Sequence, residues 1–134
     1  MLDSVKLHAL SISDESTQRD WGQSIIIKAE SRNDETVFYR EKFLIFKPGA
    51  SIILESHSDY DEIWIPNNTL TYIKETDNEL VEYVAKEHER IFIPRGIKHK
   101  IINDNTHELC IFEIQVGKID PTDKQQYIDE DLAL

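Results

Sequence analysis

The sequence feature that most constrains the fold is a succession of short β-type segments separated by turn residues. About nine such segments lie within roughly ninety residues, and no helical periodicity interrupts them. Turn-forming residues stand between them, for example at Lys47-Pro48-Gly49 and Asp77-Asn78. The predicted strands are Ser24–Ala29, Val37–Lys47, Ser51–His57, Glu62–Ile65, Thr69–Lys74, Leu80–Val84, Arg90–Ile93, His99–Ile102 and Leu109–Val116. Many short strands with this spacing predict an all-β sandwich or barrel.

The length of the chain predicts a single domain, because 134 residues suit one hydrophobic core of ordinary size. We expect the barrel to occupy residues 19–119, after a weakly patterned N-terminal segment over residues 1–18. The acidic tail over residues 120–134 is expected to form a short helix or a frayed extension, since Asp120-Pro121 suits a helix start.

The charge balance limits the partners of the protein. Fifteen basic residues against 26 acidic ones give a formal net charge of −11, which disfavours binding to nucleic acid or to anionic membranes. The single cysteine, Cys110, cannot form an internal disulfide and suits a reducing compartment. No segment has the run of roughly 20 apolar residues that spans a bilayer. We therefore expect a soluble, cytoplasmic protein that acts on a small molecule.

Two predicted strands have faces that bear on packing. Alternation along Leu109–Val116 separates an apolar face, able to pack, from a face that can line a polar cavity. The first set is Cys110, Phe112, Ile114 and Val116, and the second is Leu109, Ile111, Glu113 and Gln115. The segment Phe43–Phe46 is apolar at every position, which predicts burial of both its faces by a second sheet or by another subunit. We therefore expect a homodimer.

Four side chains that can bind a metal stand near the ends of predicted strands. Because side chains alternate along a strand, Glu55 and His57 are expected to point to one side. Glu62 opens the next strand, and His99 follows a Pro-Arg-Gly turn. Two buried carboxylates without a cation would be costly, and this donor set suits Zn, Mn, Fe, Co or Ni. The predicted metal ligands are Glu55, His57, Glu62 and His99.

The spacing of these residues resembles that of the cupin superfamily. Glu55-x-His57-x4-Glu62 resembles the first cupin motif, and Pro94-x-Gly96-x-x-His99-x-x-x-Asn103 resembles the second. The chain is also similar to the cupin domain of type II mannose-6-phosphate isomerases over residues 19–123. Further matching segments are Arg19-Asp-Trp21-Gly22, Lys47-Pro-Gly49 and Glu113-x-Gln115-x-Gly117. The resemblance implies a small double-stranded β-helix, or jelly-roll barrel, with a short C-terminal extension.

The resemblance implies a metal-dependent aldose–ketose isomerase that acts on a sugar phosphate similar to mannose 6-phosphate. Glu55 stands where the family has Gln, and Asp59-Tyr60 stands where it has His and Arg. We expect Glu113, or Glu55 if it does not bind the metal, to act as general base. Residues expected to contact the substrate are Tyr60, Trp64, Arg95, Lys98 and Gln115. Candidates to hold an anionic substrate group are Lys42, Arg95, Lys98 and Lys100.

Two other functions fit the same residues. The altered first motif is compatible with a cupin that binds a sugar or another small molecule without catalysis. An iron-loaded site would instead suit a metal-dependent oxygenase. The metal that the protein contains would separate these alternatives.

Overall fold

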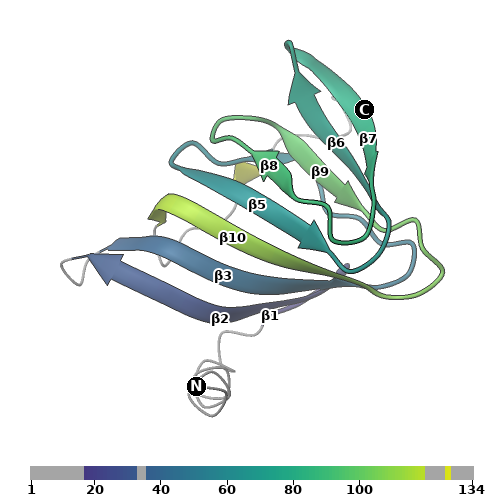
Figure 1. Ribbon diagram of the computed structural model, residues 1–134, viewed down its shortest axis with the longest axis horizontal. Helices are drawn as coiled ribbons and strands as arrows, with labels where there is room; N and C mark the ends of the chain where they lie inside the picture. The colour runs from purple at the N-terminus through teal and green to yellow at the C-terminus, as the bar shows by residue number, and fades with distance from the viewer. Residues whose placement is uncertain (1–16, 33–35, 120–125, 128–134) are drawn as a thin grey trace.

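The computed structural model describes residues 17–32, 36–119 and 126–127, and every regular element within these ranges is a β-strand. The strands form two antiparallel sheets, ordered β1-β2-β3-β10-β5-β8 and β11-β4-β9-β6-β7 (Figure 1). Their bounds are β1 Thr17–Arg19, β2 Gly22–Arg32, β3 Thr36–Phe46, β4 Glu55–Ser56, β5 Tyr60–Pro66, β6 Leu70–Thr76, β7 Glu79–Ala85, β8 Ile91–Ile93, β9 His99–Ile102, β10 Leu109–Ile119 and β11 Gln126–Tyr127. The predicted all-β jelly-roll barrel is confirmed.

Both ends of the chain extend beyond the ranges just given. The predicted N-terminal segment lies almost entirely outside the described residues, and so does most of the acidic tail. The short strand β11 is the part of the tail that the structure describes, and it pairs with β4. None of the described residues forms a helix of the length and apolarity that crossing a membrane requires.

The main hydrophobic core lies between the two sheets. It contains the fully buried Phe46 and Leu109 from the six-stranded sheet and Leu70 and Ile101 from the five-stranded sheet. Alternation explains this arrangement, because every second residue of β3 and β10 points into the interior. Each apolar side chain of this size stabilises the fold by about 1.5–3 kcal/mol when it is fully buried.

The inward-facing residues of β3 and β10 change character along the strands. At one end, here called the apolar end, they are Leu44, Phe46, Leu109 and Ile111. At the other, here called the polar end, they are Arg40, Lys42, Glu113 and Gln115. The register pairs Lys42 with Glu113 and Arg40 with Gln115, so the polar residues lie side by side on neighbouring strands.

The predicted continuous strand Ser51–His57 is wrong. Only Glu55–Ser56 forms a strand, and Ser51 makes an isolated bridge to Ile102. Neighbouring side chains are both buried there, since Leu54 is 0% and Glu55 is 2% exposed. Alternation of residue types therefore does not show where ladder pairing begins and ends in this segment.

The prediction that both faces of Phe43–Phe46 are buried holds only in part within one chain. Leu44 and Phe46 are buried, whereas Phe43 is 36% exposed and Ile45 is half-buried. The same outer side of the sheet carries the apolar face of β10, including Phe112. Cys110 belongs to this outer face and is half-buried.

Gly117 permits a close approach between β10 and the start of β5. Its φ is +139°, and a Cβ atom there would lie 2.4 Å from the carbonyl oxygen of Asp59 and 2.7 Å from the Cα of Tyr60. A residue with a side chain would push these strands apart. Gly117 thus keeps Tyr60 in register with β10 at the polar end.

Candidate metal centre

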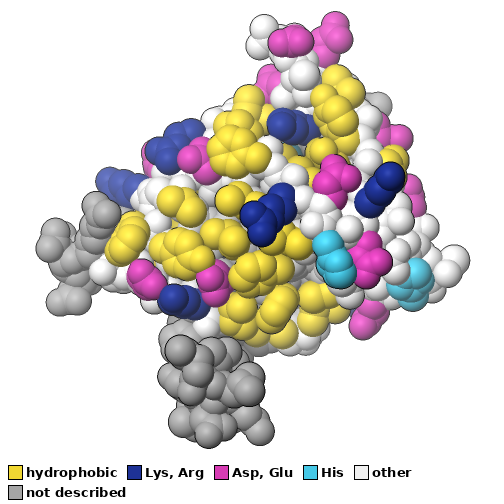
Figure 2. Space-filling view, viewed as in Figure 1, with side chains coloured by type: hydrophobic (Ala, Val, Ile, Leu, Met, Phe, Trp, Pro, Cys, Tyr) yellow, Lys and Arg dark blue, Asp and Glu magenta, His cyan; other side chains and the backbone are white. Residues whose placement is uncertain are grey.

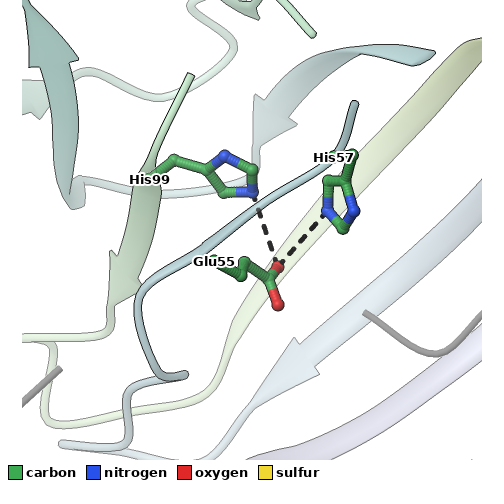
Figure 3. A group of neighbouring side chains, drawn as sticks. All are labelled: Glu55, His57 and His99. Atoms are coloured by element: carbon green, nitrogen blue, oxygen red, sulfur yellow. Dashed lines mark ion pairs between the residues drawn. The ribbon is translucent and has the colours of Figure 1, made fainter. Parts of the chain in front are cut away.

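Three of the predicted ligands converge in the interior between the sheets. Glu55 on β4 pairs directly with His99 on β9, and His57 follows β4 by one residue. One donor atom of each of the three lies within 4.8 Å of the others. Figure 3 shows the Glu55 carboxylate between the two imidazole rings, 3.7 Å from His57 Nε2 and 3.5 Å from His99 Nε2. All three are almost completely buried.

Glu62, the fourth predicted ligand, lies against the same two rings. One carboxylate oxygen is 3.4 Å from His99 Nε2, and the other is 3.6 Å from His57 Nε2. The carboxylate is held from behind, because Trp64 Nε1 donates to Oε1 at 3.3 Å and Gln115 Nε2 donates to Oε2 at 2.8 Å. The structure therefore brings all four predicted ligands together.

Hydrogen bonds at Nδ1 fix the orientation of both histidines. His57 Nδ1 lies 2.7 Å from the Tyr60 hydroxyl, and the two rings stack with centroids 4.5 Å apart. His99 Nδ1 lies 3.0 Å from the carbonyl oxygen of Ile97, so Nδ1 carries a proton and donates it. Such contacts are typical of metal-binding histidines, because they turn Nε2 towards the metal.

The two Nε2 atoms are the exceptional atoms of this site. Both are buried, and neither has a hydrogen-bond partner among the described residues. The carboxylate oxygens near them are at ion-pair distances and lie beyond ordinary hydrogen-bond length. Buried polar atoms are nearly always satisfied, so a divalent cation between two imidazoles and two carboxylates fits the donor set.

The charges of the site act strongly on its protons. Burial alone would lower the pKa of His99, but the nearby carboxylates of Glu55 and Glu62 outweigh it and raise the pKa to about 9. Burial would raise the pKa of Glu55, yet the contacts with His57 and His99 lower it. Without a cation, a proton on His99 therefore offsets part of the negative charge.

Three more of the predicted site residues lie around this group. Trp64 is 1% exposed, belongs to the hydrophobic core, and places its ring edge-on to His99 with centroids 5.3 Å apart. Gln115 is fully buried and also donates to Glu113 Oε1 at 2.9 Å. Burial and the charge of Glu62 raise the pKa of Glu113 to about 8.

Two predicted substrate contacts lie outside the buried group. Arg95 is exposed, and its guanidinium binds the Asp61 carboxylate at 3.1 Å. Lys98 is half-buried and uses its backbone N–H to contact a Glu75 carboxylate oxygen at 3.3 Å. Neither side chain is joined by any described contact to the four predicted ligands.

Sequence reasoning did not select Arg40, which proves to be part of the interior. Its side chain is 8% exposed, and its Nε donates to Gln115 Oε1 at 2.6 Å. Alternation along the predicted strand Val37–Lys47 contains the signal, because Arg40 shares a face with Leu44. The sequence alone does not say which face of that strand points inward.

Comparison with solved structures defines the class of protein. CapF of Staphylococcus aureus, a capsular polysaccharide assembling protein, matches with a TM-score of 0.64 and 19% identity over 84% of this chain and 31% of its own. An oxalate oxidase matches with a TM-score of 0.55 and 21% identity over 59% of this chain and 42% of its own. The Cnp3 cupin domain of Schizosaccharomyces pombe matches with a TM-score of 0.57 and 8% identity over 70% of this chain and 64% of its own. This chain has the cupin fold, and it spans less than half the length of the first two proteins.

The family follows from the sequence. The model of the mannose-6-phosphate isomerase C-terminal family matches residues 8–131, and the chain belongs to that family. This confirms the resemblance inferred from the two motifs. A search of curated proteins finds no significant match.

Proposed function

We propose that this protein is a metal-dependent cupin that interconverts the aldose and ketose forms of a phosphorylated sugar. The observation that carries the proposal is the pair of buried His57 and His99 Nε2 atoms, which face two carboxylates and have no hydrogen-bond partner within the described chain. Glu55 and Glu62 complete the proposed ligand set. Membership of the mannose-6-phosphate isomerase C-terminal family supports the choice of reaction.

The bound cation would act as a Lewis acid towards the carbonyl and hydroxyl oxygens of the sugar. Glu113 is the base that we favour, because Glu55 lies between the two histidines and is committed to them. As a carboxylate, Glu113 would take a proton from one substrate carbon and return it to the neighbouring carbon through an enediol, while a second proton moves from the hydroxyl oxygen of the substrate to its carbonyl oxygen. Gln115 holds Oε1 of Glu113 at 2.9 Å and so fixes the position of the base.

The first experiment measures the metal content of the protein and its isomerase activity before and after chelation. We expect one zinc or manganese ion per chain, and we expect complete chelation to abolish interconversion of mannose 6-phosphate and fructose 6-phosphate. Isomerase activity in fully metal-free protein would contradict the proposal. Bound iron with oxygen consumption would support an oxygenase instead, and a protein that takes up no metal would support a binding module.

A pair of variants separates the base from the ligands. Glu113→Gln should keep the metal and lose about 100-fold or more in kcat, since general-base catalysis contributes on that order. Glu82→Gln, which changes an exposed carboxylate on β7, is the matched control and should retain both metal and activity. An active Glu113→Gln variant would remove Glu113 from the proposed mechanism.

We also propose that two copies pair through the outer face of the six-stranded sheet. A row of opposed apolar residues crosses four strands at Ile25, Phe43, Phe112 and Ile65. Figure 2 shows hydrophobic side chains gathered over these strands. The chain carries a net charge of −11, so two copies repel one another in general. The repulsion is weakest where the apolar residues of this row face each other. Patches of this kind mark interaction sites.

The dimer is tested by light scattering after size-exclusion chromatography. Wild-type protein should have twice the mass of one chain, and Phe43→Glu should shift it to a monomer because it buries a charge in the interface. Val84→Glu, at a 65% exposed position on β7, is the control that should leave the dimer intact. A wild-type monomer at micromolar concentration would refute the pairing.

We propose that the protein is located in the cytoplasm, because its single cysteine, Cys110, forms no disulfide and suits a reducing compartment.

A further inference from the structure

Two cations are buried at the polar end of β3, next to the candidate metal centre. Arg40 and Lys42 are each 8% exposed, and both point into the interior. Across the sheet they pair in register with Gln115 and Glu113. Lysine and arginine are rarely buried to this extent without a partner of opposite charge. The partners of Arg40 and Lys42 therefore determine whether these two cations are available to a ligand.

Lys42 has no hydrogen-bond or ion-pair partner in the described structure. No described residue makes a hydrogen bond to its ammonium, and no described carboxylate lies within ion-pair distance of it. Glu113 is near enough to attract the charge, but burial still lowers the pKa of Lys42. The Lys42 side chain is 8% exposed and its ammonium has no described acceptor, which points to a ligand that supplies the missing acceptors.

Arg40 has donors to spare. A guanidinium carries five N–H groups, and within the described chain the side chain of Arg40 uses only Nε, which binds Gln115. Its remaining N–H groups form the planar fork that matches an oxyanion. Arg40 and Lys42 thus present unused donors from two neighbouring inward positions of one strand.

The charge of the interior leads to the same conclusion. Two carboxylates, Glu55 and Glu62, balance a divalent cation. Glu113 and Lys42 offset one another, whether both are ionised or both are neutral. Among the described buried side chains, the positive charge of Arg40 then remains without compensation. A metal-loaded interior is therefore selective for an anion.

The position of these donors relative to the metal centre limits the size of the ligand. Arg40 binds Gln115 Oε1, and Gln115 Nε2 binds the Glu62 carboxylate, so one side chain separates the free donors from a proposed metal ligand. A single small molecule that contacted both places would carry its anionic group a few bonds from the atoms that react.

We propose that Arg40 and Lys42 form an oxyanion subsite that holds the phosphate or carboxylate group of the substrate beside the metal centre. The assignment of that group to a sugar phosphate rests on the proposed function, whereas the subsite itself rests on the unused donors. The proposal assigns anion recognition to β3 in the interior. It gives no part in anion binding to Arg95, because the Arg95 guanidinium is already bound to Asp61.

The test measures binding of inorganic phosphate and, separately, of acetate to the protein as purified with its metal, by calorimetry. Wild-type protein should bind at least one of the two anions. Lys42→Met should weaken that binding by about 10- to 100-fold, the usual value of a hydrogen bond to a charged group, while the metal content stays unchanged. Arg95→Gln and Lys118→Met, which change exposed cations, are the matched controls and should bind as the wild type does. If Lys42→Met fails to fold, Lys42→Gln and Arg40→Gln take its place.

Each outcome decides a separate point. Absence of binding of both anions to metal-loaded protein, or equal binding by Lys42→Met and wild type, overturns the subsite. Loss of binding in Arg95→Gln alone would place anion recognition on the surface and also overturns it. Preference for acetate supports the subsite but contradicts a sugar phosphate as substrate. Lys42-dependent phosphate binding by a protein that takes up no metal supports the subsite and contradicts the proposed metal-dependent reaction.

Discussion

The apolar end and the polar end of β3 and β10 differ although they belong to the same pair of strands. At the apolar end, Leu44 and Phe46 lie opposite Ile111 and Leu109, and all four join the hydrophobic core. At the polar end, the same alternation points two cations, one carboxylate and one amide inward. Burial stabilises the first set and costs free energy for the second. One end therefore holds the fold together, and the other carries the residues to which we assign binding.

The largest effect that distinguishes the two ends is expected from Leu109→Ala at the apolar end. Leu109 is completely buried, so the truncation should lower the free energy of unfolding by about 2–5 kcal/mol. Metal affinity of the folded variant should stay within about threefold of the wild type, because Leu109 pairs with Phe46 at the apolar end and is not one of the proposed ligands. Urea denaturation and a metal titration measure the two effects. Val84→Ala, on the 65% exposed position of β7, should cost no more than about 0.5 kcal/mol.

The converse variant is His99→Ala at the metal centre. Removal of a proposed ligand should weaken metal binding by more than about 100-fold, beyond the usual cost of losing a residue that only orients a ligand. The metal-free variant should unfold at a lower urea concentration than metal-free wild type at neutral pH, because it loses the imidazolium that offsets the negative charge of Glu55 and Glu62. Competition against a chelator of known affinity gives the first quantity. Unchanged metal affinity would show that His99 is a structural histidine.

The residues that orient the histidines are expected to have a smaller effect. Tyr60→Phe removes the hydroxyl that lies 2.7 Å from His57 Nδ1 and leaves the stacked ring in place. Metal affinity should fall by about 10- to 100-fold. Tyr72→Phe is the control, because Tyr72 is buried against Trp64 and its ring makes no contact with His57. Equal metal affinities in the two variants would contradict the orienting role.

The difference between the two ends also explains which features of the fold and of the site could be predicted from the sequence. Strand positions follow from local alternation and turns, so β3 and β10 were predicted to within a few residues, and motif spacing selected His57 and His99 across the chain. Which face of a strand points inward depends on the whole sheet. The apolar face of β10 proved to be the outer one, and Arg40 was missed for the same reason. The predicted strand at Ser51–His57 failed because ladder pairing, which local alternation does not reveal, is limited there to Glu55–Ser56 and an isolated bridge at Ser51.

The smallest expected step, about tenfold for each unit of pH, is the pH dependence of metal binding, which follows from the raised pKa of His99. Below about pH 9 a proton occupies Nε2, and the metal must displace it. The apparent association constant should therefore rise about tenfold per pH unit from neutral pH and level off near pH 9. The stability of the metal-free protein changes with pH in the opposite direction. The pKa of His99 is higher in the folded state than its unfolded value of 6.5. Its contribution to the free energy of unfolding is therefore complete below pH 6.5 and is lost as the pH rises through about 9. Chelator competition and urea denaturation over this range measure the two trends. A metal affinity that levels off near pH 6.5 would show that Glu55 and Glu62 do not hold the proton on His99.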